Sequence, residues 1–269
     1  MLDTPDRAAL LALLDFYVEA GVDIALDEEP HNRLMESVST APAPRPEASS
    51  DGQPLVQRIE AKPLTASPDA AAQTAREQAM NAQNLAELEA LLARFEGCGL
   101  KVTAKNLVFA DGNPAGRIMF VGEAPGGDED RVGKPFVGRS GQLLDRMLAA
   151  IALDRTQVYI ANVVPWRPPG NRTPTPQEVA ICKPFIEKQI ELADPDILVC
   201  LGGPSAQTLL NMRDGILKTR GRWFSYQTGR REIRAFATLH PAYLLRQPLQ
   251  KRLAWRDFRA LKRALETPS

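Results

Sequence analysis

The chain has 269 residues, of which 25% are charged, and it contains 33 basic side chains, 33 acidic side chains and three cysteines. A chain of this length can build a hydrophobic core without disulfide bonds, which excludes a small disulfide-stabilised scaffold. No apolar run approaches the ~20 residues of a membrane span, and the N-terminus lacks a signal-peptide pattern. We therefore expect a cytoplasmic protein with no membrane partner.

The charges are separated along the chain, although they cancel overall. Residues 1–97 hold 17 acidic and 7 basic side chains, whereas residues 217–263 hold 13 basic side chains against Glu232 and Asp257. A basic C-terminal quarter indicates a face that binds a polyanion. Basic side chains scattered over a solvated surface would give the same count, so the charge alone leaves both interpretations open.

The N-terminal third is predicted to hold a helix, a linker and a second helix. Thr4 and Pro5 suit the start of a helix over residues 5–20, and Gly21 suits its end. Five prolines among Ala, Ser and charged residues predict a disordered linker. We expect a helical extension over residues 1–37, a linker over residues 38–68 and one domain over residues 69–269, which a long helix over about 69–95 opens.

From residue 117 onward, short apolar runs alternate with helical patterns, which is typical of an α/β domain. The runs at residues 117–121, 158–163, 197–201 and 233–239 predict four strands, and the first three are continuously apolar, as in a parallel sheet covered on both faces. Ser140 is expected to cap the helix that follows it. Thr175 and Glu178 form the pattern of a capping box that opens the next helix, and two more helices are expected after Gly202 and over about 249–265.

Polar and aromatic side chains follow three of these strands. The first strand leads into Gly122-Glu123-Ala124 and a glycine-rich loop with Phe136, the second ends near Asn162, and the fourth is followed by His240. Because ligands bind outside the carboxyl ends of parallel strands, we expect these side chains to meet in one site. Each side chain alone also fits a structural role, such as a cap, a core aromatic or a packed histidine.

Together the side chains suit a uracil base. The Asn162 carboxamide offers an acceptor beside a donor, which matches N3–H and O4 of uracil but not the edge of cytosine, and an aromatic ring offers a stacking surface. The His240 imidazole could stabilise negative charge that develops on O2 as the base departs. The sequence shows no plausible Ser-His-Asp set and no GxxxxGK[ST] loop, which argues against a triad hydrolase or an NTPase.

Five motifs resemble, in order, those of the uracil-DNA glycosylase superfamily and most closely its family 4. They are VFADGNP at 108–114, VGEAPGGDED at 121–130, GKPFVGRSGQLLDRML at 133–148, YIANVVPWRPPGNRTPTPQE at 159–178 and LHPAYLLR at 239–246. The resemblance covers about residues 95–265. It implies a three-layer α/β/α sandwich around a four-stranded parallel sheet, and an enzyme of base excision repair that hydrolyses the N-glycosidic bond of deoxyuridine and leaves an abasic site.

The resemblance also implies a role for each matching residue. Ala124, as is usual in family 4, stands where the wider superfamily often has an aspartate that orients the attacking water. Glu123 is a candidate for that task, and a structural role beside the sheet is the alternative. Leu244 takes the place of the wedge that fills the stack vacated by the flipped base. The implied roles are base binding by Gly122, Ala124, Phe136 and Asn162, catalysis by His240, Glu123 and Asn162, and contact with DNA by Ser140, Leu244 and Arg246.

The cysteines depart from the family pattern. Family 4 enzymes usually carry a [4Fe-4S] cluster on four cysteines, of which Cys98 and Cys182 match two, whereas Lys101 and Trp166 replace the others. An ammonium group and an indole are not ligands for iron, so we expect neither a metal nor another cofactor. Cys200 is expected to be a small core residue.

Other functions remain open on the sequence. A module of the same fold could bind damaged or single-stranded DNA without turnover, and a cluster-bearing relative could be a redox sensor. The presence of Asn162, Phe136 and His240 together favours the enzyme, and the two missing ligands count against the sensor. We expect a monomer that acts on DNA containing uracil, with other deaminated bases as further candidate substrates.

Overall fold

The computed structural model describes residues 68–266. The expected extension over residues 1–37 and nearly all of the expected linker lie outside the described residues. Within residues 68–266, no helix has both the length and the apolar composition that crossing a membrane requires.

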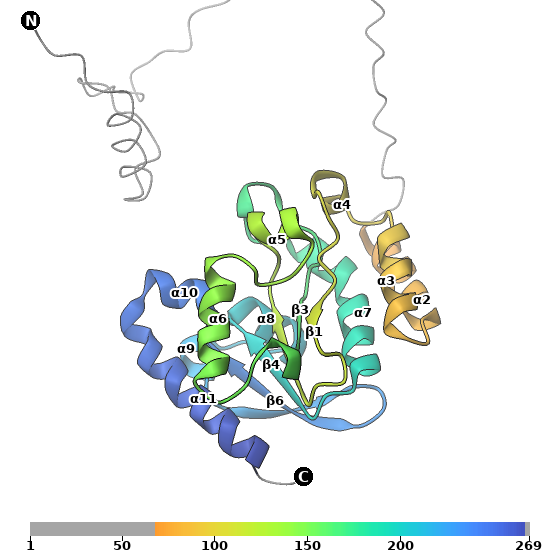
Figure 1. The fold of residues 1–269 in the computed structure, drawn as a ribbon. Helices are drawn as coiled ribbons and strands as arrows, with labels where there is room; N and C mark the ends of the chain where they lie inside the picture. The colour runs from red at the N-terminus through yellow and green to blue at the C-terminus, as the bar shows by residue number, and fades with distance from the viewer. Residues whose placement is uncertain (1–67, 267–269) are drawn as a thin grey trace, which may run out of the picture. The chain divides into compact units, whose positions relative to one another are not determined.

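A six-stranded mixed sheet forms the centre of the described domain (Figure 1). Its order is β1-β3-β2-β4-β6-β5, and β3, β2, β4 and β6 are mutually parallel, whereas β1 and β5 pair antiparallel at the two edges. The expected sheet of four parallel strands is thus the middle of a larger mixed sheet. The strands are β1 (Asp111–Gly112), β2 (Ile118–Gly122), β3 (Val158–Asn162), β4 (Ile197–Leu201), β5 (Trp223–Gln227) and β6 (Glu232–Thr238).

The sequence analysis missed both edge strands, because neither carries a continuous apolar run. β1 has two residues, and its backbone alone pairs it with β3. In β5, half-buried Trp223 and Phe224 are followed by exposed and half-buried residues in alternation, since a strand at the sheet edge is only partly covered.

Helices cover both faces of the sheet (Figure 1). On one face, strand residues that include Val121 and Cys200 form a core with α2 (Pro68–Asn81), α3 (Leu85–Arg94), α7 (Pro176–Ala193) and α8 (Gly203–Leu210). On the other face, Phe120 and Val199 pack with α6 (Arg139–Ala149) and α11 (Lys251–Glu266). The domain therefore has three layers in the order α/β/α. Cys200 is a fully buried core residue, as expected. Short helices α4 (Leu100–Thr103), α5 (Gly127–Val132), α9 (Ile216–Thr219) and α10 (Pro241–Arg246) lie in the connections.

Local hydrogen bonds correct two of the helix predictions. The single helix expected over 69–95 is two helices, because the Asn84 side chain accepts a hydrogen bond from the Glu87 backbone N–H and so caps α3. The helix α6 starts after Gly138, so Ser140 lies inside its first turn and does not cap it. The capping box of Thr175 at the start of α7 is confirmed.

The strand order places a crevice between β2 and β4. From β2 the chain crosses to β3 on one side, and from β4 it crosses to β5 and β6 on the other side, so the direction of winding reverses between β2 and β4. At such a reversal the loops after the two strands diverge and leave room for a ligand. The loops that begin at Gly122 and Gly202 flank this crevice.

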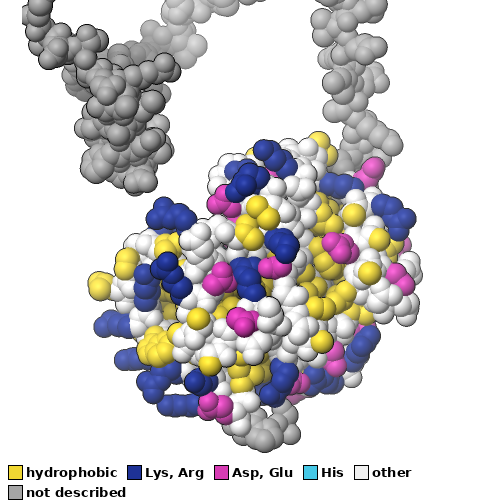
Figure 2. Space-filling model, viewed as in Figure 1, with side chains coloured by type: hydrophobic (Ala, Val, Ile, Leu, Met, Phe, Trp, Pro, Cys, Tyr) yellow, Lys and Arg dark blue, Asp and Glu magenta, His cyan; other side chains and the backbone are white. Residues whose placement is uncertain are grey.

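The basic side chains of the C-terminal quarter have two different environments. Arg220 forms an ion pair with buried Asp257, and Arg231 pairs with Asp194 and Asp196 at the surface, so these side chains are engaged within the domain. Figure 2 shows other Lys and Arg side chains gathered over α10 and α11, at the left of the view, with hydrophobic side chains between them. The surface of α11 therefore carries a basic cluster.

Candidate active site

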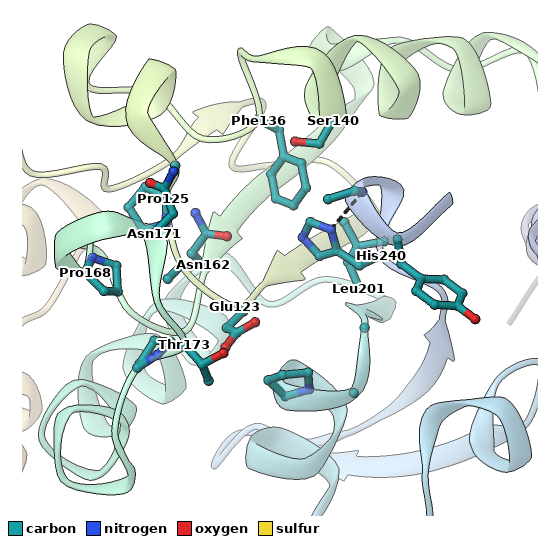
Figure 3. A pocket seen from close by; sticks show the side chains of 18 of the residues that line it. Glu123, Pro125, Phe136, Ser140, Asn162, Pro168, Asn171, Thr173, Leu201 and His240 are labelled. Carbon is teal, nitrogen blue, oxygen red and sulfur yellow. Dashed lines mark hydrogen bonds between the residues drawn. The ribbon is translucent and has the colours of Figure 1, made fainter. Parts of the chain in front are cut away.

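A cavity of about 620 Å³ opens at the carboxyl ends of the parallel strands. Figure 3 shows Asn162, Phe136 and His240 directed into the same space, although they come from β3, the loop before α6 and the start of α10. The fold thus brings together most of the residues expected at the site. Those that line the cavity are Glu123, Ala124, Phe136, Ser140, Asn162, His240 and Arg246.

Asn162 lies at the last position of β3, where it is opposite Gly122 of β2. A Cβ atom at Gly122 would approach the Phe136 ring to 2.7 Å and would also collide with the Asn162 side chain. Glycine is therefore needed at position 122 to let the ring and the carboxamide come together. Gly122 supports the expected base-binding residues from beneath and is not itself a lining residue.

Two buried oxygen atoms in this cavity lack a hydrogen-bond partner. Among residues 68–266, Glu123 Oε1 and Asn162 Oδ1 are the only buried side-chain nitrogen or oxygen atoms without one. Leaving a buried polar atom unpaired costs about 1–3 kcal/mol, and most native proteins avoid it. Both exceptions lie in one cavity, where a polar ligand or a water molecule can pair with them. Burial also raises the pKa of the Glu123 carboxyl group.

We expect Glu123→Gln to raise the thermal stability of the protein at pH 8. Burial raises the pKa of Glu123 in the folded protein, so above that pKa the wild-type fold carries the full free-energy cost of a buried charge. As the pH falls toward the ordinary pKa of a glutamate, the buried carboxylate is protonated and this cost is lost. The gain in Tm should be a few degrees, since 1 kcal/mol corresponds to ~2–4 °C in a domain of this size. Calorimetry at several pH values checks that the gain is smaller at pH 5.

Glu129→Gln is a matched control for that substitution. The Glu129 carboxylate accepts hydrogen bonds from the backbone N–H groups of Gly126, Val137 and Gly138, at 3.1, 3.0 and 2.9 Å. It therefore ties the loop after β2 to the loop that carries Phe136, and the glutamine variant should melt at a lower temperature. A lower Tm for Glu123→Gln as well would show that the Glu123 carboxylate is a structural group.

Phe136 is held in an unusual backbone conformation. Its φ of 54° lies in the left-handed region, and its buried ring stacks on His240 with 5.4 Å between ring centroids. Arg155 holds this turn, because its guanidinium donates to the Phe136 carbonyl and pairs with Asp111 at 2.6 Å. Gly141 leaves the space for the same carbonyl. No sequence pattern pointed to Arg155, since it lies 19 residues from Phe136 and outside the expected elements.

His240 is a neutral hydrogen-bond donor toward the cavity. Its Nδ1 accepts a hydrogen bond from the Ala242 backbone N–H at 3.1 Å, which caps α10 (dashed line, Figure 3). Burial and the nearby Arg246 lower its pKa from the ordinary 6.5 to about 4. At neutral pH the ring therefore carries one proton, and the bond to Nδ1 places that proton on Nε2.

The residues expected to contact DNA have different positions. Ser140 and Arg246 line the cavity, as expected for groups near a bound nucleotide. Leu244 is 1% exposed and packs on Leu239 and Ala254, so its side chain does not project toward DNA as a wedge must. Leu245, the next residue of α10, is 36% exposed. The sequence motif identified the helix, but burial argues against Leu244 as the wedge.

Two walls of the cavity were not expected from the sequence. One is the loop over residues 168–174, where the Asn171 side chain accepts a hydrogen bond from Arg167 at 2.7 Å. The other is the turn after β4, where Gly202 has a φ of 96° and passes close to the His240 side chain. Residues 165–169 (PWRPP) and Gly202-Gly203-Pro204 have the composition of turns, but only the strand order places them at the crevice.

The thiols do not fit a four-cysteine cluster. Cys98 and Cys182 are buried, with their Sγ atoms 3.9 Å apart. Lys101 donates from Nζ to the Ala93 carbonyl at 2.7 Å, and Trp166 is packed in the same core as both cysteines. Across residues 68–266, no group of three or more His, Cys, Asp or Glu side chains could hold a metal ion. The protein thus offers two thiol ligands, where such a cluster takes four.

Known proteins are similar to this chain over the same region. The family model described as the uracil DNA glycosylase superfamily matches residues 109–259. A type-4 uracil-DNA glycosylase of Archaeoglobus fulgidus is 41% identical over 168 residues, which are 61% of this chain and 84% of the relative. The type-4 enzyme of Thermotoga maritima is 45% identical over 150 residues, 55% of this chain and 77% of the relative. The matched region contains the strands and loops that form the cavity, and the chain belongs to the uracil DNA glycosylase superfamily.

Proposed function

We propose that this protein is a DNA repair glycosylase that hydrolyses the N-glycosidic bond of deoxyuridine in DNA, releases uracil and leaves an abasic site. The observation that carries the proposal is the pair of unpartnered buried oxygens, Asn162 Oδ1 and Glu123 Oε1, in one cavity with an aromatic ring and a neutral imidazole. The relatives named type-4 uracil-DNA glycosylases support it.

Asn162 selects the base. Its unpartnered Oδ1 accepts from uracil N3–H, and its amide NH₂ donates to O4, while Phe136 offers a surface against the base. Cytosine presents an acceptor at N3 and a donor at N4, so both contacts reverse. The cost of two mismatched buried groups excludes cytosine from the site.

His240 and Glu123 act on the bond that breaks. As the C1′–N1 bond opens, its electron pair stays with uracil, and Nε2–H of His240 donates to the negative charge on O2. Because this imidazole is neutral, it stabilises the leaving anion without a prior protonation step. Glu123 orders the water that adds to C1′ and accepts its proton, for which a carboxylate with a raised pKa is suited.

The main alternative is a module that binds damaged DNA without turnover. Incubation with an oligonucleotide that contains one uracil, followed by alkali, separates the two functions, because strand breakage at the uracil requires release of the base. The same oligonucleotide with cytosine or thymine is the control. Binding without breakage would identify the non-catalytic module, and a panel of deaminated bases defines the substrate range.

We propose further that the protein works without an iron-sulfur cluster, as a monomer in a reducing compartment such as the cytoplasm. Three free cysteines suit such a compartment. The cavity already contains every group that the proposed reaction uses, so the reaction needs no residue from a second subunit.

The purified protein is expected to contain no stoichiometric iron and to remain active after Cys98→Ala. Lys101 and Trp166 are tied into the fold by other contacts, so two thiolates remain as ligands. Iron and acid-labile sulfide analysis checks this expectation. Four irons per chain, lost together with activity in Cys98→Ala, would contradict it.

A further inference from the structure

A second hollow lies beside the active-site cavity, on the other side of α10. Its volume is about 230 Å³, and its walls come from α6, α10 and α11. The walls are mainly apolar and include Met147, Leu244 and Trp255. Trp255 is 46% exposed, although a large aromatic side chain on a monomer surface is usually covered better than this. The hollow thus presents an accessible ring beside an apolar floor.

The edge of the hollow is cationic. Arg146 of α6 and Lys251 of α11 line it, and Arg252, Arg256 and Arg259 continue along the exposed side of α11. The acidic residue within this stretch, Asp257, is buried and paired with Arg220. Figure 2 shows this gathering of basic and hydrophobic side chains over α10 and α11. An aromatic ring between cations is the arrangement that binds unpaired nucleotides, with bases on rings and phosphates on cations.

The hollow and the proposed substrate site lie on different faces of the same helix, α10. Tyr243 and Arg246 of α10 line the active-site cavity, whereas Leu244 of the same helix lines the hollow. One helix with its side chains is ~10–12 Å wide. About three nucleotides cover that width at the ~3.4 Å rise of a stacked duplex strand, and fewer nucleotides cover it when the strand is extended and unstacked. A strand that places one base in the active site can therefore place another, up to about three positions away, at Trp255.

We propose that the hollow formed by α6, α10 and α11 is a second nucleotide subsite, which holds an unstacked base against Trp255 and its phosphates on Arg146 and Lys251. Bases in a duplex are paired and stacked, so the subsite takes single-stranded DNA. This inference rests on the proposed function and adds that the DNA substrate is single-stranded near the uracil. A strand that occupies both sites must be unpaired on at least one side of the uracil.

Tryptophan fluorescence tests the subsite without any catalysis. A uracil-free thymidine oligonucleotide is expected to quench the emission, because a base that stacks on Trp255 quenches its ring. Of the other two tryptophans, Trp166 is buried and Trp223 lies half-buried in the edge strand β5. The Trp255→Phe variant should lose the quenching but keep most of its affinity. Trp255→Ala should bind the oligonucleotide about tenfold more weakly, in line with the loss of one stacked base.

Met80→Ala is the matched control, since Met80 is exposed on α2 in the opposite helical layer. It should bind the oligonucleotide as the wild type does. Unchanged affinity in Trp255→Ala, or an equal loss of affinity for duplex DNA without unpaired bases, would overturn the subsite. Equal loss would identify α11 as a contact for duplex phosphates instead.

A series of single-stranded oligonucleotides with uracil at one end tests the spacing. Addition of nucleotides on one side should raise kcat/KM in a step within the first three. This step should vanish in Trp255→Ala, while both proteins release uracil equally from the shortest substrate. A smooth rise with length in both proteins would contradict the subsite. Absence of uracil release from every substrate would refute the proposed function, and the fluorescence result would still decide the subsite.

Discussion

Asn162→Ala is expected to lower single-turnover release of uracil by at least about a thousandfold. The substitution removes both the acceptor for N3–H and the donor to O4 at a side chain that is only 5% exposed, where each unmade hydrogen bond is costly. The backbone of position 162 pairs within the sheet and should be unaffected. Rapid-quench assays with enzyme in excess over a uracil oligonucleotide measure the effect.

Asn162→Asp should lose uracil activity and gain weak release of cytosine. An ionised carboxylate cannot donate to O4, which explains the loss. The protonated acid can donate to N3 of cytosine and accept from its amino group, and burial raises the pKa of a carboxyl group at this position. Cytosine release should therefore increase as the pH falls, and assays of both bases across pH measure it.

Asn171→Ala controls for a carboxamide in the same cavity. In the wild type, the Asn171 side-chain oxygen already accepts a hydrogen bond from Arg167, so it is not available to accept one from the base, as Asn162 Oδ1 is. This variant should keep its preference for uracil over cytosine. Full uracil activity in both Asn162 variants would show that Asn162 does not read the base.

His240→Ala is expected to lower single-turnover cleavage about a hundredfold or more, while binding of the DNA weakens much less. The imidazole stabilises charge that appears mainly in the transition state, so its loss affects the chemical step. Because the pKa of His240 is about 4, its titration should leave the wild-type rate unchanged between pH 5 and 8. Single-turnover rates and equilibrium binding measured on the same oligonucleotide separate the two effects.

The same depressed pKa makes a second test possible. A histidine that is neutral in the fold contributes stability that is complete above its ordinary pKa of 6.5 and is lost as the pH falls toward 4. His240→Ala should remove this part of the acid sensitivity.

Arg246→Ala is the comparison for the binding and single-turnover measurements on His240→Ala. It should weaken binding in a salt-dependent way, with a smaller effect on cleavage. Equal losses of binding and cleavage in His240→Ala would make His240 a structural residue.

The sequence by itself determined the α/β class, the four central strands and most of the site. Continuous apolar runs identify buried strands, and in a parallel sheet the residues that follow such strands meet at one edge, so Glu123, Asn162 and His240 could be grouped without coordinates. All three line the cavity. The ordered motifs contain these strand ends and the loops after them, and this is why they pointed to the superfamily.

Only the tertiary structure decided which side chains are buried, which distant residues are in contact and how the buried groups are protonated. Which residue of α10 faces inward depends on packing against α6 and α11, so Leu244 is buried although its motif position implies a wedge. The Arg155 contact with the Phe136 carbonyl joins residues that no local pattern relates. The pKa of His240 and the unpaired oxygen of Glu123 follow from burial, which is the sum of contacts from several distant segments. Local sequence specifies the order of strands and loops, whereas exposure, protonation and the hollow beside α10 arise only when those elements are packed.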